Sequence, residues 1–341
     1  MTTRIRIVAL LGALTLVAAA CGDDSGDAGA DTTAATETTA PGTSTTDAPA
    51  ETTTTAAAPD TTAAMDETDE SMCGAVSIAL DASSFPELVG DVHYEGWAII
   101  DGAPVTTGKF DVVGGETVLL DGSAAECFSA DGLEDATSLV ITIEPAGDTD
   151  SIPSDTHFVA GDIADKGATL TIDHPAALGT DFADAAGTVL LATPTNGDGT
   201  NELSGIWFLE LPGPTASLVL PTLPAGWAYE GWAVIDGVPV TSGTFLTPEG
   251  FDDFDGYSGD QGGPPFPGED YLVDAPEGVT LPTDLTGATI VISVEPSPDD
   301  SPAPFVLKPL VGVAGDPATD HESYVLDNTA TDLPFATAVI G

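Results

Sequence analysis

The stretch YEGWAIIDGAPVTTGKF spans residues 94–110, and a second copy, YEGWAVIDGVPVTSGTF, spans residues 229–245. Thirteen of the seventeen positions are identical, at a constant offset of 135 residues. Aromatic and β-branched residues lead in each copy to an Asp-Gly pair, which tolerates the positive φ angles of a type I′ turn. Each copy therefore predicts a β-hairpin, and the chain is predicted to contain two β-rich repeats.

The shared positions of the hairpin form the core motif by which each repeat is recognised. They are Tyr94, Trp97, Asp101, Gly102, Gly108 and Phe110 in the first copy and Tyr229, Trp232, Asp236, Gly237, Gly243 and Phe245 in the second. An aromatic side chain can bury about 150–250 Å², so Trp97 and Trp232 are interpreted as core anchors. A ligand-stacking platform is the alternative, but apolar residues on both faces of the strand favour the core.

A second shared element lies downstream of each hairpin. Residues 138–145 read SLVITIEP and residues 289–296 read TIVISVEP, at an offset of 151. The second repeat therefore carries sixteen additional residues, which fall between Pro248 and Tyr271. Many short strands between Gly and Pro turns predict an all-β chain. We expect two tandem β-sandwich domains, Ig-like or related, at residues 73–184 and 185–341.

The charge balance is extreme, with 56 acidic residues against 5 basic ones and a formal net charge of −51. Nucleic acid would be repelled by such a chain, as would an anionic lipid surface. A salty habitat, in which self-repulsion is screened, is the preferred explanation of the acidity.

Residues 1–20 are predicted to be a secretion signal, because Arg4 and Arg6 precede an apolar run that is short for a spanning helix. The run ends in small residues before Cys21, which resembles a bacterial lipobox. This resemblance implies lipidation of Cys21 and anchorage on the extracytoplasmic side of a bacterial cell membrane; ordinary cleavage is the alternative. Residues 21–72, rich in Thr, Ala and Asp, are predicted to be a disordered tether.

Cys73 and Cys127 are the two cysteines beyond the leader and tether. An even pair in an exported protein predicts one disulfide, which would contribute roughly 2–4 kcal/mol. Two free thiols are the alternative. The second repeat has neither cysteine, so such a bridge would be an accessory of the first repeat.

The order of motifs resembles the extracytoplasmic C-terminal domain of anti-sigma-K factors, present twice. In the second repeat the match begins at residues 220–224, reading LPTLP, and continues through Tyr229, Trp232 and Phe245 to Glu295-Pro296. The resemblance implies a β-sandwich outside the membrane that binds or senses something. It does not imply direct contact with a sigma factor, because the chain shows no cytoplasmic segment joined to a spanning helix.

The additional residues of the second repeat contain the acids Asp252, Asp253, Asp255 and Asp260. Clustered oxygen ligands near glycine turns suit Ca²⁺, so calcium is a candidate ligand, although no cofactor is required. A solvated acidic loop is the alternative, because the spacing departs from that of an EF-hand.

No catalytic constellation is evident, because the four histidines are dispersed and no G-x-S-x-G elbow is present. Glu95, Glu144, Glu230 and Glu295 recur between the repeats and are interpreted as buried, hydrogen-bonded groups. The predicted function is a non-catalytic surface lipoprotein that interacts with an unknown envelope protein or glycan, or senses one. A calcium-stabilised glycan-binding matrix protein and an unrecognised hydrolase are the alternatives.

Overall fold

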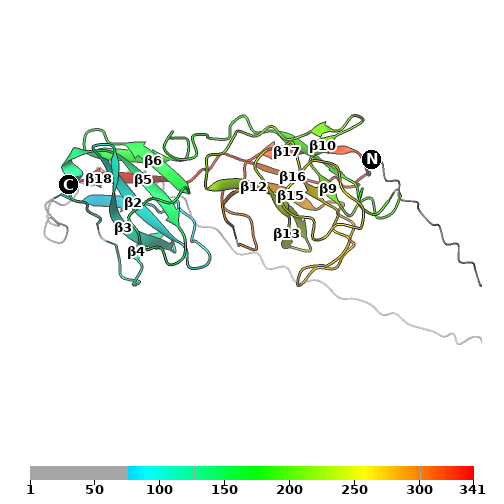
Figure 1. Ribbon diagram of the computed structural model, residues 1–341, viewed down its shortest axis with the longest axis horizontal. Coiled ribbons are helices and arrows are strands. Elements are labelled where there is room, and N and C mark those ends of the chain that lie inside the picture. The colour runs from blue at the N-terminus through cyan, green and yellow to red at the C-terminus, as the bar shows by residue number, and fades with distance from the viewer. Residues whose placement is uncertain (1–75, 126, 198, 300) are drawn as a thin grey trace, which may run out of the picture. The chain divides into compact units, whose positions relative to one another are not determined.

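The computed structural model of the chain describes residues 76–125, 127–197, 199–299 and 301–341 (Figure 1). The predicted signal peptide, Cys21, the tether and Cys73 lie outside the described residues. The described part is all-β, as the sequence predicts. Its one helix is a single 3₁₀ turn, η1 (Leu133–Asp135), so no described helix is long and apolar enough to cross a membrane.

The first repeat forms an antiparallel sheet of eight strands. Their order across the sheet is β1-β18-β7-β6-β5-β2-β3-β4. Their bounds are β1 Ile78–Asp81, β2 His93–Ile100, β3 Ala103–Val113, β4 Glu116–Leu119, β5 Ala136–Glu144, β6 His157–Asp162, β7 Gly167–Thr171 and β18 Phe335–Ile340. Two backbone hydrogen bonds between Ile78 and Phe128, of 2.7 and 2.9 Å, join edge strand β1 to the segment after β4. The sheet is thereby bent back towards itself.

The second repeat forms another antiparallel sheet of eight strands, in the order β13-β12-β15-β16-β17-β8-β9-β14. Their bounds are β8 Gly187–Leu191, β9 Ile206–Trp207, β12 Trp227–Ile235, β13 Val238–Phe245, β14 Gly268–Glu269, β15 Thr289–Pro296, β16 Leu310–Val313 and β17 Ser323–Asn328. A small ribbon of β10 (Leu209–Glu210) and β11 (Thr215–Ala216) accompanies it. The two β-sandwich repeats of the prediction are therefore confirmed.

The two hairpins have the predicted turns and the same register. Asp101 and Gly102 have φ angles of 50° and 78°, and Asp236 and Gly237 have 52° and 85°, as a type I′ turn requires. In both hairpins the register shifts just before the tryptophan, at Gly96 in β2 and at Gly231 in β12. The local sequence thus specifies the turn and the bulge twice.

The last strand does not follow the expected division at residues 184 and 185. β18 pairs with β1 and β7, so residues 335–340 of the predicted second domain complete the first sheet. In the first sheet β18 pairs with β7. In the second sheet the equivalent partner of β17 is β8, which lies before the hairpin of that repeat in the sequence. Strand pairing between distant segments is decided by backbone hydrogen bonds that no local pattern specifies.

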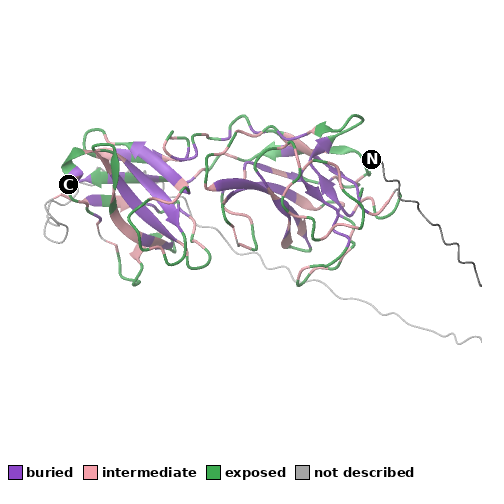
Figure 2. Ribbon diagram, viewed as in Figure 1, coloured by how far each residue is buried: buried purple, intermediate pink, exposed green. Residues whose placement is uncertain are grey.

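The aromatic residues of the hairpin motif are buried in both sheets, and the ribbons of β2 and β12 are largely in the buried colour in Figure 2. The Asp-Gly pairs at the turns, at 101–102 and 236–237, are exposed. Tyr94 stacks on Phe110 with ring centroids 5.4 Å apart, and Tyr229 stacks on Phe245 at 5.7 Å. Each tyrosine hydroxyl donates a hydrogen bond to a proline carbonyl eight residues upstream, at 2.9 Å for Tyr94 and 2.7 Å for Tyr229. The polar ends of these buried rings are therefore satisfied.

Candidate functional site

Trp97 and Trp232 are core residues, with 1% and 2% of their surface exposed. The indole Nε1 of Trp97 donates to Thr142 Oγ1 at 2.8 Å, and that of Trp232 donates to Ser293 Oγ at 2.8 Å. Neither ring offers a face to solvent, so the structure favours the core interpretation over a stacking platform for ligands.

The same hydroxyl groups continue to a buried glutamate in each sheet. Thr142 donates to Glu144, which also accepts from the backbone N–H of Ser154 at 3.0 Å. Glu295 accepts from the backbone N–H of Phe305 at 2.8 Å. Both glutamates are buried and hydrogen-bonded, as predicted, which is the pattern of structural carboxylates.

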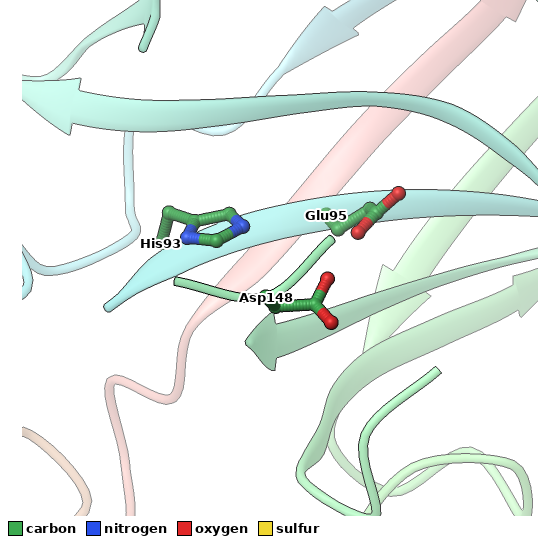
Figure 3. Close-up of side chains that lie close together, drawn as sticks. All are labelled: His93, Glu95 and Asp148. Atoms are coloured by element: carbon green, nitrogen blue, oxygen red, sulfur yellow. The ribbon is translucent and has the colours of Figure 1, made fainter. Parts of the chain in front are cut away.

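A cluster of charged groups lies at one end of the β2 strand (Figure 3). Ligand atoms of His93, Glu95 and Asp148 lie within 4.8 Å of one another. The ammonium of Lys109 lies among them, 2.6 Å from Asp148 Oδ2 and 3.5 Å from Glu95 Oε2. It also donates to the backbone oxygen of Asp148 at 2.9 Å. The first repeat therefore holds a partly buried cation between buried Glu95 and half-buried Asp148.

The electrostatics of this cluster follow from burial and from the lysine. Burial lowers the pKa of His93, and the positive charge of Lys109 lowers it further. The hydrogen bond from Lys109 holds the pKa of Asp148 below its usual value. Lys109 therefore pairs with Asp148 and Glu95, and this pairing favours the charged forms of the ammonium and of Asp148.

The additional loop of the second repeat folds against its own hairpin. Asp252 accepts from the backbone N–H of Gly268 at 2.8 Å and from that of Phe254 at 3.1 Å. Asp253 accepts from both the N–H and the hydroxyl of Thr244 at 2.8 Å. The loop thus connects β13 to β14, the two outermost strands of the second sheet.

Two fully buried acids organise the base of this loop. Asp270 accepts from the backbone N–H of Thr195 and from the indole of Trp207, both at 2.7 Å. Glu269 accepts from the hydroxyl of Ser258 and from the backbone N–H of Tyr257 at 3.2 Å. Burial raises the pKa of both acids. Their hydrogen bonds join the loop to Thr195 and Trp207 on one side and to Tyr257 and Ser258 on the other.

Residues of the loop, together with Thr195 and Trp207, line an open pocket of about 360 Å³. Aromatic side chains, carboxylates and glycines share its wall, and Phe251 is 69% exposed at its rim. The side chains that line it are Thr195, Trp207, Phe251, Asp252, Asp253, Phe254, Asp255, Ser258, Gln261 and Phe266. Burial raises the pKa of Asp252 to about 7. None of these lining residues is basic, so the pocket favours a neutral or positively charged ligand.

Three of the four acids predicted as calcium ligands, Asp252, Asp253 and Asp255, line the same pocket, but their ligand atoms do not converge on one point. Within the described ranges, the one group of three His, Asp or Glu side chains with ligand atoms inside 4.8 Å is His93, Glu95 and Asp148. Asp252 and Asp253 hold separate parts of the loop backbone, whereas Asp255 and Asp260 are exposed. Calcium binding by this loop stays a prediction without support from the geometry.

The predicted disulfide also stays a prediction, since Cys73 lies outside the described residues. Cys127 lies beside Phe128, the residue whose backbone pairs with β1. A bridge from Cys127 to Cys73 would therefore act on the closure of the first sheet.

Neither a family model, nor a curated protein, nor a solved structure matches this chain.

Sequence reasoning missed three features of the site. It did not pair Lys109 with Asp148, it treated Glu269 and Asp270 as part of a solvated loop, and it did not foresee a pocket. One signal was present: Lys109 is one of only three lysines beyond the leader, and the second repeat has Thr244 at the same position.

Proposed function

We propose that the chain is a non-catalytic bacterial surface lipoprotein, anchored through Cys21, whose second repeat binds a glycan in the loop pocket. The observation that carries the proposal is the pocket itself, which combines exposed Phe251 with carboxylate acceptors. Ligand pockets typically join apolar walls to a few converging polar groups. Sugar hydroxyls can donate to the carboxylates while an aromatic face covers the apolar side of the ring.

The charge of the wall selects among glycans. Asp252, Asp253 and Asp255 line the pocket, and the chain carries a formal net charge of −51. Sulfated or uronic-acid glycans would be repelled, whereas neutral or amine-bearing glycans would be accepted. Envelope glycans with free or acylated amino groups are therefore the proposed class of ligand.

The anti-sigma-K resemblance supports the placement of this module outside the membrane and not a sigma-factor contact. Its aromatic marker residues Tyr94, Trp97, Tyr229 and Trp232 are buried. They describe how the sheets are packed and present no surface to a partner. The ligand is therefore sought in the part of the second repeat that the first one lacks.

A catalytic role is disfavoured because the most buried acids are used by the fold. Glu144, Glu269, Asp270 and Glu295 all accept hydrogen bonds from neighbouring backbone or side-chain groups. Hydrolysis of neutral glycosides, esters or peptides by the purified chain would overturn the non-catalytic assignment.

The test is a glycan array probed with the secreted Cys21→Ser protein. Neutral and amine-bearing glycans are expected to bind, and acidic ones are not. Phe251→Ala and Asp255→Asn are expected to weaken binding about tenfold. Phe335→Ala serves as a matched control, because Phe335 is an exposed phenylalanine of the first sheet. Equal binding by Phe251→Ala and wild type would remove the pocket from the proposal.

A further inference from the structure

The two hairpins hold an equivalent pair of glutamates in an equivalent way. Glu95 lies opposite Lys109 in the β2–β3 register, and Glu230 lies opposite Thr244 in the β12–β13 register. The hydroxyl of Thr106 donates to Oε1 of Glu95, and that of Thr241 donates to Oε1 of Glu230. One oxygen of each carboxylate is thus fixed by the same contact.

The second oxygen differs between the repeats. In the first sheet, Oε2 of Glu95 lies 3.5 Å from the ammonium of Lys109. In the second sheet, the position of Lys109 is taken by Thr244, whose hydroxyl donates to Asp253 at 2.8 Å. Oε2 of each glutamate is buried without a hydrogen-bond partner. Oε2 of Glu95 still has the ion pair with Lys109, whereas among the described residues no ion pair reaches Oε2 of Glu230, which is only 5% exposed. A buried carboxylate oxygen without a partner lowers the stability of the folded chain.

The charges that act on Glu230 are negative. They come from Glu295, Asp299 and Asp253. Asp299 follows Glu295 by the same four residues that separate Asp148 from Glu144. Glu95 and Asp148 hold the Lys109 ammonium in the first sheet. Their counterparts in the second sheet are Glu230 and Asp299. The nearby cation of the second repeat, half-buried Lys308, acts on Glu295, and it is not among the charges that act on Glu230.

We infer that the second repeat binds a metal cation at Glu230 and Asp299, in the position that the Lys109 ammonium occupies in the first repeat. Carboxylate and carbonyl oxygens favour hard cations such as Ca²⁺ or Mg²⁺. The two carboxylates would offset the charge of a divalent ion, and the ion would satisfy the unpartnered oxygen of Glu230. This site is distinct from the glycan pocket and does not depend on the proposed function.

Burial and the neighbouring acids also raise the pKa of Glu230 to about 8. A carboxyl with this affinity for a proton is one that a cation at the same place would stabilise in its charged form.

The experiment measures calcium binding by the Cys21→Ser protein near neutral pH, by titration calorimetry and by thermal unfolding. Magnesium and potassium at matched ionic strength are the competing probes. We expect one site, and a melting temperature that rises with calcium. Glu230→Gln is expected to weaken calcium binding at least about tenfold.

The decisive variant is Thr244→Lys, which keeps both carboxylates and restores an internal ammonium. It is expected to raise the melting temperature in chelator and to abolish the calcium-dependent rise. The reciprocal Lys109→Thr removes the ammonium of the first repeat and is expected to create a second calcium site. Lys166→Thr and Thr200→Lys, at exposed positions, control for the change in net charge.

Two results would overturn the inference. One is the absence of binding by calcium, magnesium and potassium alike. The other is calcium binding that survives Thr244→Lys but is lost in Asp252→Ala with Asp255→Ala, because that outcome places the ion in the acidic loop. Glycan binding is measured on the same variants, so a failed cation site and a failed glycan pocket are distinguished.

Discussion

The two repeats share one scaffold and differ in how it is completed. Both have the Asp-Gly turn, the bulge before the tryptophan and the chain of hydrogen bonds from indole to hydroxyl. The first sheet is completed by β18, and its buried Glu95 is paired with the ammonium of Lys109. The second sheet is completed by β8 and by its longer loop. The hairpin therefore specifies packing, and the additions around it are free to carry function.

The largest expected effect comes from removing β18. A chain that ends at Pro334 loses the pairing of β18 with β1 and β7, and three buried side chains, Ala336, Ala338 and Ile340. We expect a loss on the order of 5 kcal/mol, comparable to the stability of a small domain. Hydrogen exchange should show lost protection in β1 and β7 while β15 and β16 stay protected.

Two controls sharpen this result. Val339→Ala changes an exposed side chain of the same strand and should leave protection unchanged. A peptide of residues 335–341 added to the truncated chain should restore protection in β7. Full protection of the truncated chain without peptide would show that the first sheet is stable alone.

The next effect tests the partly buried cation of the first repeat. Lys109→Met leaves Glu95 buried at 1% exposure without its counter-charge. Removing one partner of a buried ion pair typically costs about 3–5 kcal/mol. Because Lys109 is partly exposed, we expect a loss at the lower end, about 3 kcal/mol. Urea unfolding followed by circular dichroism measures it.

The matched variant in the second repeat is Thr244→Val. It removes the hydroxyl that donates to Asp253 but leaves the charge at that position unchanged, so we expect a loss of only about 1 kcal/mol. Equal losses in the two variants would contradict the assignment of Lys109 as a buried counter-ion.

A smaller effect is the pH dependence of stability that Glu295 gives to the second sheet. Burial raises the pKa of Glu295 from its ordinary 4.5 to about 7. Between these values the folded chain binds the proton that the unfolded chain releases. The contribution to stability is thus complete below about 4.5 and is lost as the pH rises to about 7. We expect the free energy of unfolding to fall by an amount on the order of 2 kcal/mol over this window.

Glu295→Gln should remove the share of Glu295 from this fall of stability with pH, while Asp252 and Glu230, whose pKa values burial also raises, keep the rest. Urea unfolding is performed with a chelator, so that no metal ion occupies the proposed cation site. Glu249→Gln removes an exposed carboxyl from the same repeat and is the control. Stability that rises with pH in both variants and in wild type alike would show that Glu295 does not titrate in this range.

Local chemistry explains what the sequence could predict. The Asp-Gly turn, the alternation of the strands and the burial of Trp97 and Trp232 depend on neighbours in the chain, and all are seen in the structure. The position of the additional loop followed from the offset between the repeats. The sequence showed which acids the loop contains, but not which groups donate hydrogen bonds to them.

Long-range pairing explains what it could not. The alternation in residues 335–340 predicts a strand, yet nothing in those residues indicates that the partner is β7 and not β17. Similarly, Lys109 meets Asp148 because the loop after β5 turns back over β2. Both contacts depend on backbone positions set by the whole sheet.

The last comparison concerns the glycines that directly precede the two tryptophans, where the expected difference between the repeats is small. A Cβ atom on Gly96 would lie 2.3 Å from Thr107 Oγ1 and 3.6 Å from Ile141. On Gly231 it would lie 2.3 Å from Ser242 Oγ and 2.8 Å from the ring of Phe208, which is fully buried. A hydroxyl can rotate away, whereas a buried ring must shift with its neighbours.

Gly231→Ala is therefore expected to destabilise the chain by about 1–3 kcal/mol, and Gly96→Ala by less, because overpacking is felt most where the neighbour is rigid. Thermal unfolding of the two variants measures the difference. Phe208→Leu in the Gly231→Ala background makes room beside the added methyl group and should reduce its cost, although it lowers stability by itself. If Gly96→Ala proves the more damaging of the two, the rigidity of Phe208 is not what distinguishes the second hairpin from the first.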